Sequence, residues 1–105
     1  MSWQASPETD EDLIAARDYL AADSEAAARD FLDAAFEAFD LLAQFPEKGP
    51  KARFKHKDLG TMRFFGLTPP FNHWLIFHQP TAEGVDIKRV LYGNVNWRQE
   101  PERFF

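Results

Sequence analysis

The chain has 105 residues, of which 45% are hydrophobic, and its net charge is −5. This length and apolar content predict one globular domain over residues 1–105 and exclude a disordered chain. The absence of cysteine excludes disulfides, thiolate metal ligands and a cysteine nucleophile, and is typical of the reducing cytoplasm. No apolar run reaches the roughly 20 residues that cross a bilayer, and no signal peptide is visible, so we expect a cytoplasmic protein without membrane contact.

Charge is distributed unevenly along the chain. Residues 1–47 carry twelve Asp or Glu and two Lys or Arg, whereas residues 48–105 carry five and ten, so the two halves have net charges of −10 and +5. This asymmetry indicates two surfaces with different roles, although a fold that interleaves the charges in space explains it equally well. Tight sequence-independent binding of nucleic acid depends on neutralising phosphates, so a net acidic chain is a poor candidate for it.

The acidic half predicts a short strand followed by two helices. Residues 3–5 form the strand, and Ser6 and Pro7 then begin a helix as its N-cap and first helical residue. A second helix begins at Ser24 and ends before Pro46. Its apolar stripe requires burial and consists of Ala28, Phe31, Ala35, Phe39 and Leu42.

Three apolar segments in the basic half predict strands, because they are rich in aromatic and β-branched residues and are bounded by Pro, Gly or Asn. They are residues 62–67, 74–79 and 85–92, and the short links between them predict antiparallel hairpins. An alternating basic segment, residues 51–58, precedes them as an exposed strand or an extended loop. The tail, residues 94–105, predicts a short helix or a last strand.

Helices first and strands later predict an α+β fold, with an N-terminal α-hairpin packed on one face of a small, mainly antiparallel β-sheet. Arg63 and Arg89 lie inside otherwise apolar strands. Because an unpaired buried charge is costly, they indicate that each strand keeps one face open to solvent or to a partner. Alternatively, both arginines form ion pairs with acids of the helices. We weigh these interpretations almost equally and favour the open face for Arg63.

Metal-independent cleavage of RNA needs a base, an acid and cations that hold the phosphate. His56, His73 and His78 have side chains whose ordinary pKa lies near neutrality. His56 lies between two lysines, which suits a phosphate contact, whereas a surface position and an ordinary sheet position explain the other two. The weak catalytic candidates are His56, Arg63, Arg89 and Tyr92. No spacing predicts a metal or cofactor site, and we expect the helix carboxylates on solvated faces.

The order of these segments and their sequence motifs resemble the RelE/ParE toxin superfamily of type II toxin–antitoxin systems over nearly the whole chain. The matching motifs are S-x-x-A-A-x-x-F-L at residues 24–32, P-x-x-G at residues 46–49 and I-x-R-V-L-x-G at residues 87–93. Ribosome-dependent RNases of the superfamily carry a late Tyr or His, and residues 101–105 contain neither. The chain therefore looks more like the ParE branch.

The resemblance to the ParE branch implies a plasmid-stabilisation toxin that inhibits growth by binding DNA gyrase and has no chemistry of its own. A cognate antitoxin with a partly disordered segment would neutralise it. The alternatives are a RelE-like, ribosome-dependent mRNA endonuclease and a degenerate member without toxicity. We expect no cofactor and no sequence-specific binding of DNA by the chain itself. The aromatic tail either folds back or forms an interface, and we favour the interface. The expected target- or antitoxin-binding residues are Arg63, Arg89, Lys55, Lys57, Trp97, Phe104 and Phe105.

Overall fold

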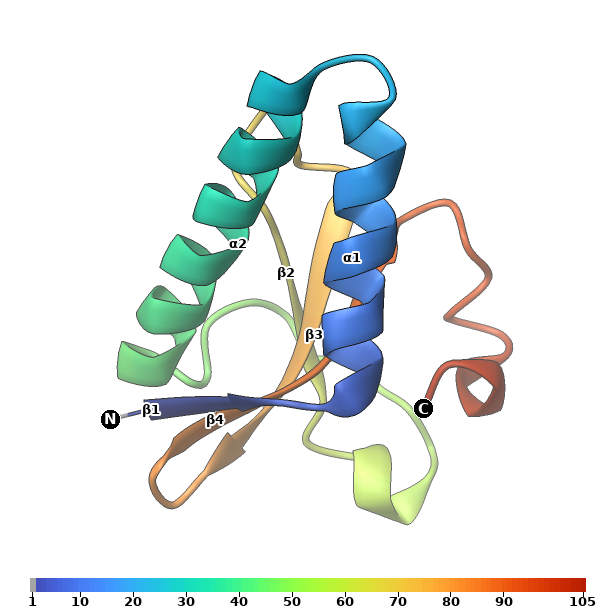
Figure 1. The fold of residues 1–105 in the computed structure, drawn as a ribbon. Helices are drawn as coiled ribbons and strands as arrows, with labels where there is room; N and C mark the ends of the chain where they lie inside the picture. The colour runs from blue at the N-terminus through green and yellow to red at the C-terminus, as the bar shows by residue number, and fades with distance from the viewer. Residues whose placement is uncertain (1) are drawn as a thin grey trace.

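The computed structural model describes residues 2–105 and shows two helices covering one face of a four-stranded sheet (Figure 1). This arrangement confirms the α+β fold. No helix within residues 2–105 combines the length and the apolar character needed to span a bilayer. The elements are β1 (Ser2–Ala5), α1 (Pro7–Ala21), α2 (Glu25–Gln44), the short 3-10 helix η1 (Lys57–Leu59), β2 (Arg63–Gly66), β3 (Trp74–Thr81), β4 (Gly84–Tyr92) and the 3-10 helix η2 (Pro101–Arg103).

The sheet is mixed, with strand order β1-β4-β3-β2. β3 is antiparallel to both β2 and β4, as the two predicted hairpins require, whereas β1 runs parallel to β4. The register shifts between Phe77 and His78, which pair with Arg89 and Ile87, so that Lys88 of β4 is passed over in the pairing. The first strand of the chain thus lies beside the last one, and the two helices connect this edge to the rest of the sheet.

The sequence sets the ends of the helices locally, as predicted. The Ser6 hydroxyl accepts a hydrogen bond from the backbone N–H of Thr9 at 3.1 Å, and Pro7 is the first helical residue. Ser24 caps α2 in the same way. α2 ends two residues before Pro46, whose ring cannot continue a helix.

The first core lies between the two helices and the sheet. Phe31, Phe39 and Leu42 of α2 are fully buried there and pack in one cluster with Ile76 of β3 and Ile87 of β4. The predicted stripe of α2 is therefore the buried face of the helix. Its members Ala28, Phe31, Ala35, Phe39 and Leu42 are all buried.

The opposite face of the sheet is covered too, by residues 51–62 and by the tail. Phe77 and Leu91 of the sheet form a second core there with Phe54 from the basic segment and Trp97 from the tail, and all four are buried. The prediction that the strands keep one face open is therefore wrong. Irregular segments of the same chain cover the face that we had reserved for solvent or a partner.

Candidate functional site

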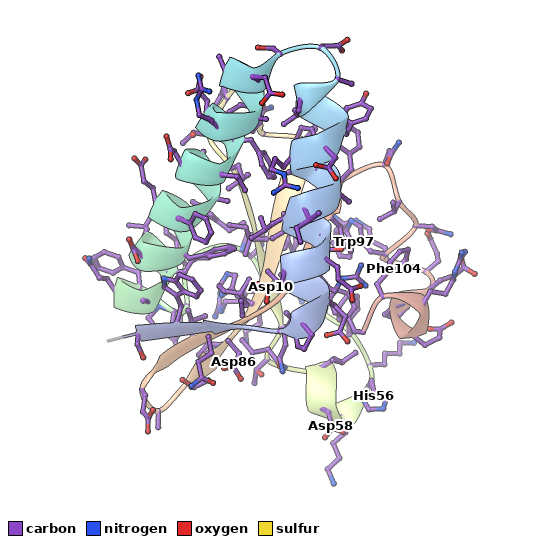
Figure 2. The ribbon with its side chains drawn as sticks, in the orientation of Figure 1. Asp10, His56, Asp58, Asp86, Trp97 and Phe104 are labelled. Atoms are coloured by element: carbon purple, nitrogen blue, oxygen red, sulfur yellow. The ribbon has the colours of Figure 1, made fainter. Side chains whose placement is uncertain are left out.

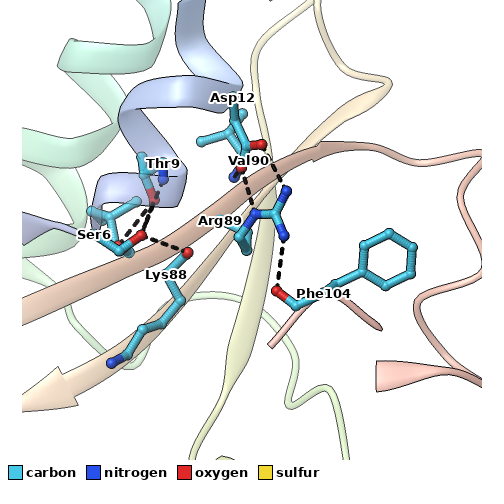
Figure 3. Close-up of polar contacts among 8 residues, drawn as sticks. Ser6, Thr9, Asp12, Lys88, Arg89, Val90 and Phe104 are labelled. Carbon is cyan, nitrogen blue, oxygen red and sulfur yellow. Dashed lines mark hydrogen bonds and ion pairs between the residues drawn. The ribbon is translucent and has the colours of Figure 1, made fainter. Parts of the chain in front are cut away.

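The most connected polar contact joins α1, β4 and the tail (Figure 3). The Asp12 carboxylate accepts hydrogen bonds from Arg89 Nε at 2.7 Å and from Arg89 Nη2 at 2.8 Å. It also accepts the backbone N–H of Val90 at 3.0 Å. The remaining guanidinium nitrogen, Nη1, donates to the carbonyl oxygen of Phe104 at 2.9 Å. All three nitrogens of the Arg89 guanidinium are therefore engaged within the chain.

This ion pair is largely shielded from water, since the side chains of Arg89 and Asp12 are 20% and 13% exposed. Hydrogen bonding to Asp12 raises the pKa of Arg89 above its ordinary value, against the opposing effect of burial. The guanidinium therefore stays charged across the physiological pH range. Of the two interpretations of Arg89, the structure shows the ion pair with a helix acid.

Asp12 belongs to a row of polar residues along one face of α1 that docks the helix on β4. Ser6 Oγ donates to the carbonyl of Lys88 at 2.8 Å, and Thr9 Oγ1 donates to the carbonyl of Ile87 at 3.1 Å. β1 pairs with β4 only as far as Ile87. From there on, these side chains donate the hydrogen bonds to the carbonyl groups at the edge of β4. The expectation that the helix carboxylates lie on solvated faces is wrong for Asp12. The sequence analysis missed this role, and the spacing of the row, every three residues from Ser6 to Asp12, is the signal that could have indicated it.

Arg63 does not form the ion pair with a helix acid that we weighed as one of its two interpretations. Its Nη1 donates to the carbonyl oxygen of Gly49 at 2.7 Å, which holds the α2–β2 connector against the sheet. Within residues 2–105 it forms no ion pair with an acid of the helices. Arg63 is half-buried, so a role in target binding stays a prediction.

His78 is fully buried beside Arg63, on the neighbouring strand. Both of its ring nitrogens lack a hydrogen-bond partner within the described chain. Burial lowers the pKa of His78 to about 4, while nearby backbone groups of Lys48 and Pro46 act in the opposite direction. Neither group is placed for a regular hydrogen bond, so His78 is a neutral core residue rather than one on an ordinary sheet face.

The four catalytic candidates do not converge on one site. His56 lies in the exposed loop before η1, at the end of the molecule opposite the α1–α2 turn (Figure 2). Tyr92 pairs with the first residue of β3, whereas Arg63 pairs with a residue four positions further along. That offset separates their positions along the sheet by about 13 Å. Arg89 is held by Asp12 under the tail. Among residues 2–105, no group of three or more His, Asp or Glu is arranged to hold a metal ion.

The tail folds back on its own sheet. Trp97 is 3% exposed, and its ring centroid lies 5.0 Å from that of Phe64 and 4.9 Å from that of Phe77. Phe104 and Phe105 are partly buried against the same core. Of the two alternatives for the tail, the structure shows the fold-back for Trp97, whose ring is buried, and a role of Trp97 in partner binding stays a prediction. Phe104 and Phe105 keep partial exposure, and Lys55 and Lys57 are exposed.

A family model described as the ParE toxin of the type II toxin–antitoxin system parDE matches residues 4–97. The matched range contains both helices, strands β2 to β4 and the Asp12–Arg89 pair. The chain belongs to the ParE toxin family. Membership makes it a toxin component of a type II system and implies an antitoxin partner. A comparison with curated proteins gives no match. In this ParE-family toxin, the contact between Arg89 and Phe104 reaches beyond the matched range.

Proposed function

We propose that this ParE-family toxin arrests growth in the cytoplasm by binding DNA gyrase, without catalysis of its own, until a cognate antitoxin neutralises it. Family membership supports the toxin part of the proposal. The observation that favours a binder over a nuclease is the engagement of Arg89 by the Asp12 carboxylate of α1 and by the tail carbonyl of Phe104.

A metal-independent nuclease needs a cation free to meet the charge that develops on the phosphate. Each nitrogen of the Arg89 guanidinium already donates to a group of the chain, and turning the group toward a phosphate would leave the Asp12 carboxylate without its partner. His56 and Tyr92 lie on different parts of the molecule, so neither would share a substrate atom with the other. These placements support a protein-binding mode of action.

The proposed contacts with gyrase or with the antitoxin are the accessible members of the predicted set. Lys55 and Lys57 are exposed, and Arg63, Phe104 and Phe105 are half-buried. A partly disordered antitoxin segment that orders on binding would cover such a dispersed surface, because it can follow the contour of the molecule.

The test is induced expression in a bacterial host, with DNA topology and total RNA read from the same culture. We expect growth arrest with relaxed or cleaved DNA and intact mRNA. Purified toxin should also inhibit supercoiling by purified gyrase. Arrest with cut mRNA would favour the nuclease, and no arrest at confirmed soluble expression would contradict both kinds of toxin.

A matched variant separates binder from nuclease. His56→Gln combined with Tyr92→Phe removes both acid–base candidates at exposed positions. We expect this double variant to arrest growth as the wild type does, because neither group is needed for a binding mode. A loss of arrest by 100-fold or more in viable count, with the folded protein still present, would favour catalysis by these residues.

A further inference from the structure

Five exposed cations lie on the two segments, residues 51–62 and 94–105, that cover the second face of the sheet. We call them the basic strip: Lys51, Arg53, Lys55, Lys57 and Arg98. None of them forms an ion pair within residues 2–105. Since no carboxylate within residues 2–105 pairs with them, these cations contribute little to stability and are available for contact with a partner.

Residues of the second core hold the backbone of the strip against the sheet. Ala52 and Phe54 alternate with the cations and are buried at 8% exposure each. The backbone N–H of Ala52 donates to the carbonyl of Met62 at 2.9 Å, which fixes the segment beside β2. The Arg98 guanidinium lies over the Trp97 ring at 4.2 Å from its centroid. Because these contacts already fix the backbone that carries the cations, binding of a ligand would cost only the conformational entropy of their side chains.

Arg53 adds a second observation from the backbone. Its φ angle is +61°, in the left-handed region that favours glycine. A residue with a Cβ costs energy there, and such positions concentrate at functional sites. The chain carries an exposed, unpaired arginine at a position where glycine would be less strained.

The structure also separates the strip from the acidic half of the chain. Residues 51–62 and 94–105, which cover the second face, carry six Lys or Arg and three Asp or Glu. Of these three acids, Glu100 already pairs with Arg103. The acidic α-hairpin covers the other face, and the molecule measures 40 × 31 × 23 Å. Salt screens charges over about 8 Å at physiological ionic strength, so the local charge of the strip decides what it attracts.

We propose that the basic strip binds the phosphate backbone of duplex DNA without regard to sequence, a role that Lys55 and Lys57 would have in addition to the protein contact proposed above. An array of unpaired cations on a fixed backbone suits a polyanion with regularly repeated charges. The whole-chain charge of −5 keeps this binding weak in isolation. Docking on a protein that already holds DNA would strengthen it through a high effective concentration.

The experiment measures anisotropy of a fluorescently labelled short DNA duplex as the wild-type toxin is added, without gyrase, at low and at increasing salt. We expect saturable binding whose affinity falls with salt, with a log–log slope no steeper than about −4.5 for five contacts. We expect Lys51→Glu/Lys55→Glu to weaken binding at least tenfold at low salt. The control, Arg17→Glu/Arg29→Glu on the α-hairpin, brings the net charge to the same −9 and should leave affinity within about twofold of the wild type.

Circular dichroism checks that each variant is folded, and the single Lys55→Gln variant replaces the strip double if it is not. Three results would overturn the proposal: no binding of duplex DNA by the wild type at low salt, equal loss in the two doubles, or tighter binding of single-stranded RNA of the same sequence. Because gyrase is absent, failure here would leave the gyrase proposal standing. Equally, intact supercoiling activity in the presence of toxin would not affect this result.

Discussion

Arg89 shows how a charge is accommodated inside an apolar strand. Its planar guanidinium donates to the Asp12 carboxylate along one edge and to the Phe104 carbonyl from its remaining nitrogen. Lysine, with a compact ammonium group, cannot reproduce this geometry. The residue therefore acts as a joint between α1, β4 and the tail.

Removing either partner of the Asp12–Arg89 ion pair should destabilise the fold. We expect Asp12→Ala to lower the free energy of unfolding by about 3 kcal/mol, because it leaves the Arg89 guanidinium and the Val90 N–H without their acceptor. Urea denaturation measures the loss. Asp12→Leu/Arg89→Met should cost less than the two single changes together, and strict additivity would show that the pair contributes no coupling.

His78 gives the toxin a defined response to pH. The pKa of His78 is about 4 in the folded protein and near its ordinary 6.5 in the unfolded chain, so the unfolded state binds the proton first as the pH falls. Stability is unaffected above that range and declines as the pH drops from about 6.5 toward 4. We expect a loss of about 2 kcal/mol between about pH 7 and pH 5.

The measurement is urea denaturation at both pH values for the wild type and for His78→Leu. Other acids titrate in the same range, so the informative quantity is the difference between the two proteins. The leucine variant should lose less stability on acidification by about 2 kcal/mol. Identical pH profiles would mean that His78 is not held neutral by the fold.

Among the secondary-structure elements, α1 is fixed at its start by a residue with two roles. Ser6 caps the helix through Thr9 and also donates to the carbonyl of Lys88 on β4, whereas Ser24 makes the cap contact of α2 alone. We expect Ser6→Ala to lower the free energy of unfolding by about 2 kcal/mol and Ser24→Ala by about 1 kcal/mol or less. Thermal or urea unfolding compares them, and equal costs would contradict the docking role.

The accuracy of the predictions from sequence differs between the elements. Periodicity and capping residues located both helices and placed the three later strands within two residues of their ends, because those signals are local. The parallel pairing of β1 with β4 was not predicted, since a four-residue strand carries no information about its neighbour. Alternation in the basic segment predicted an exposed strand or an extended loop, but not that Phe54 is buried or that Trp97, far along the chain, lies against it.

The same limit applies to the candidate site. The sequence indicated correctly that Arg89 needs compensation in an apolar strand. It did not identify Asp12, 77 residues away, as the partner, because a helix rich in carboxylates offers many equivalent choices. Similarly, no local pattern distinguishes the buried His78 from the exposed His73.

At the scale of the whole molecule, one sheet serves two cores. Ile76 and Phe77 are adjacent on β3 but belong to different clusters, so loss of the sheet dissolves both. We expect a single cooperative unfolding transition. The tail side is reported by Trp97 and the helix side by Trp3 and Trp74.

Two tryptophan variants test this cooperativity. Trp97→Phe leaves fluorescence from the helix side, and Trp3→Phe/Trp74→Phe leaves it from the tail side. In each protein, the denaturation midpoint by fluorescence should coincide with that by far-ultraviolet circular dichroism. A tail-side signal that changes at lower denaturant would show that the second core opens independently.

The pairing of β1 with β4 has a consequence for biosynthesis. The ribosome makes β1 and both helices first, yet their partners in the sheet are among the last segments to appear. Until β4 has emerged, the apolar stripe of α2 has no complete sheet to cover it, and such nascent surfaces are prone to capture by other proteins. An antitoxin already present in the cell therefore encounters an incomplete chain before any folded toxin exists.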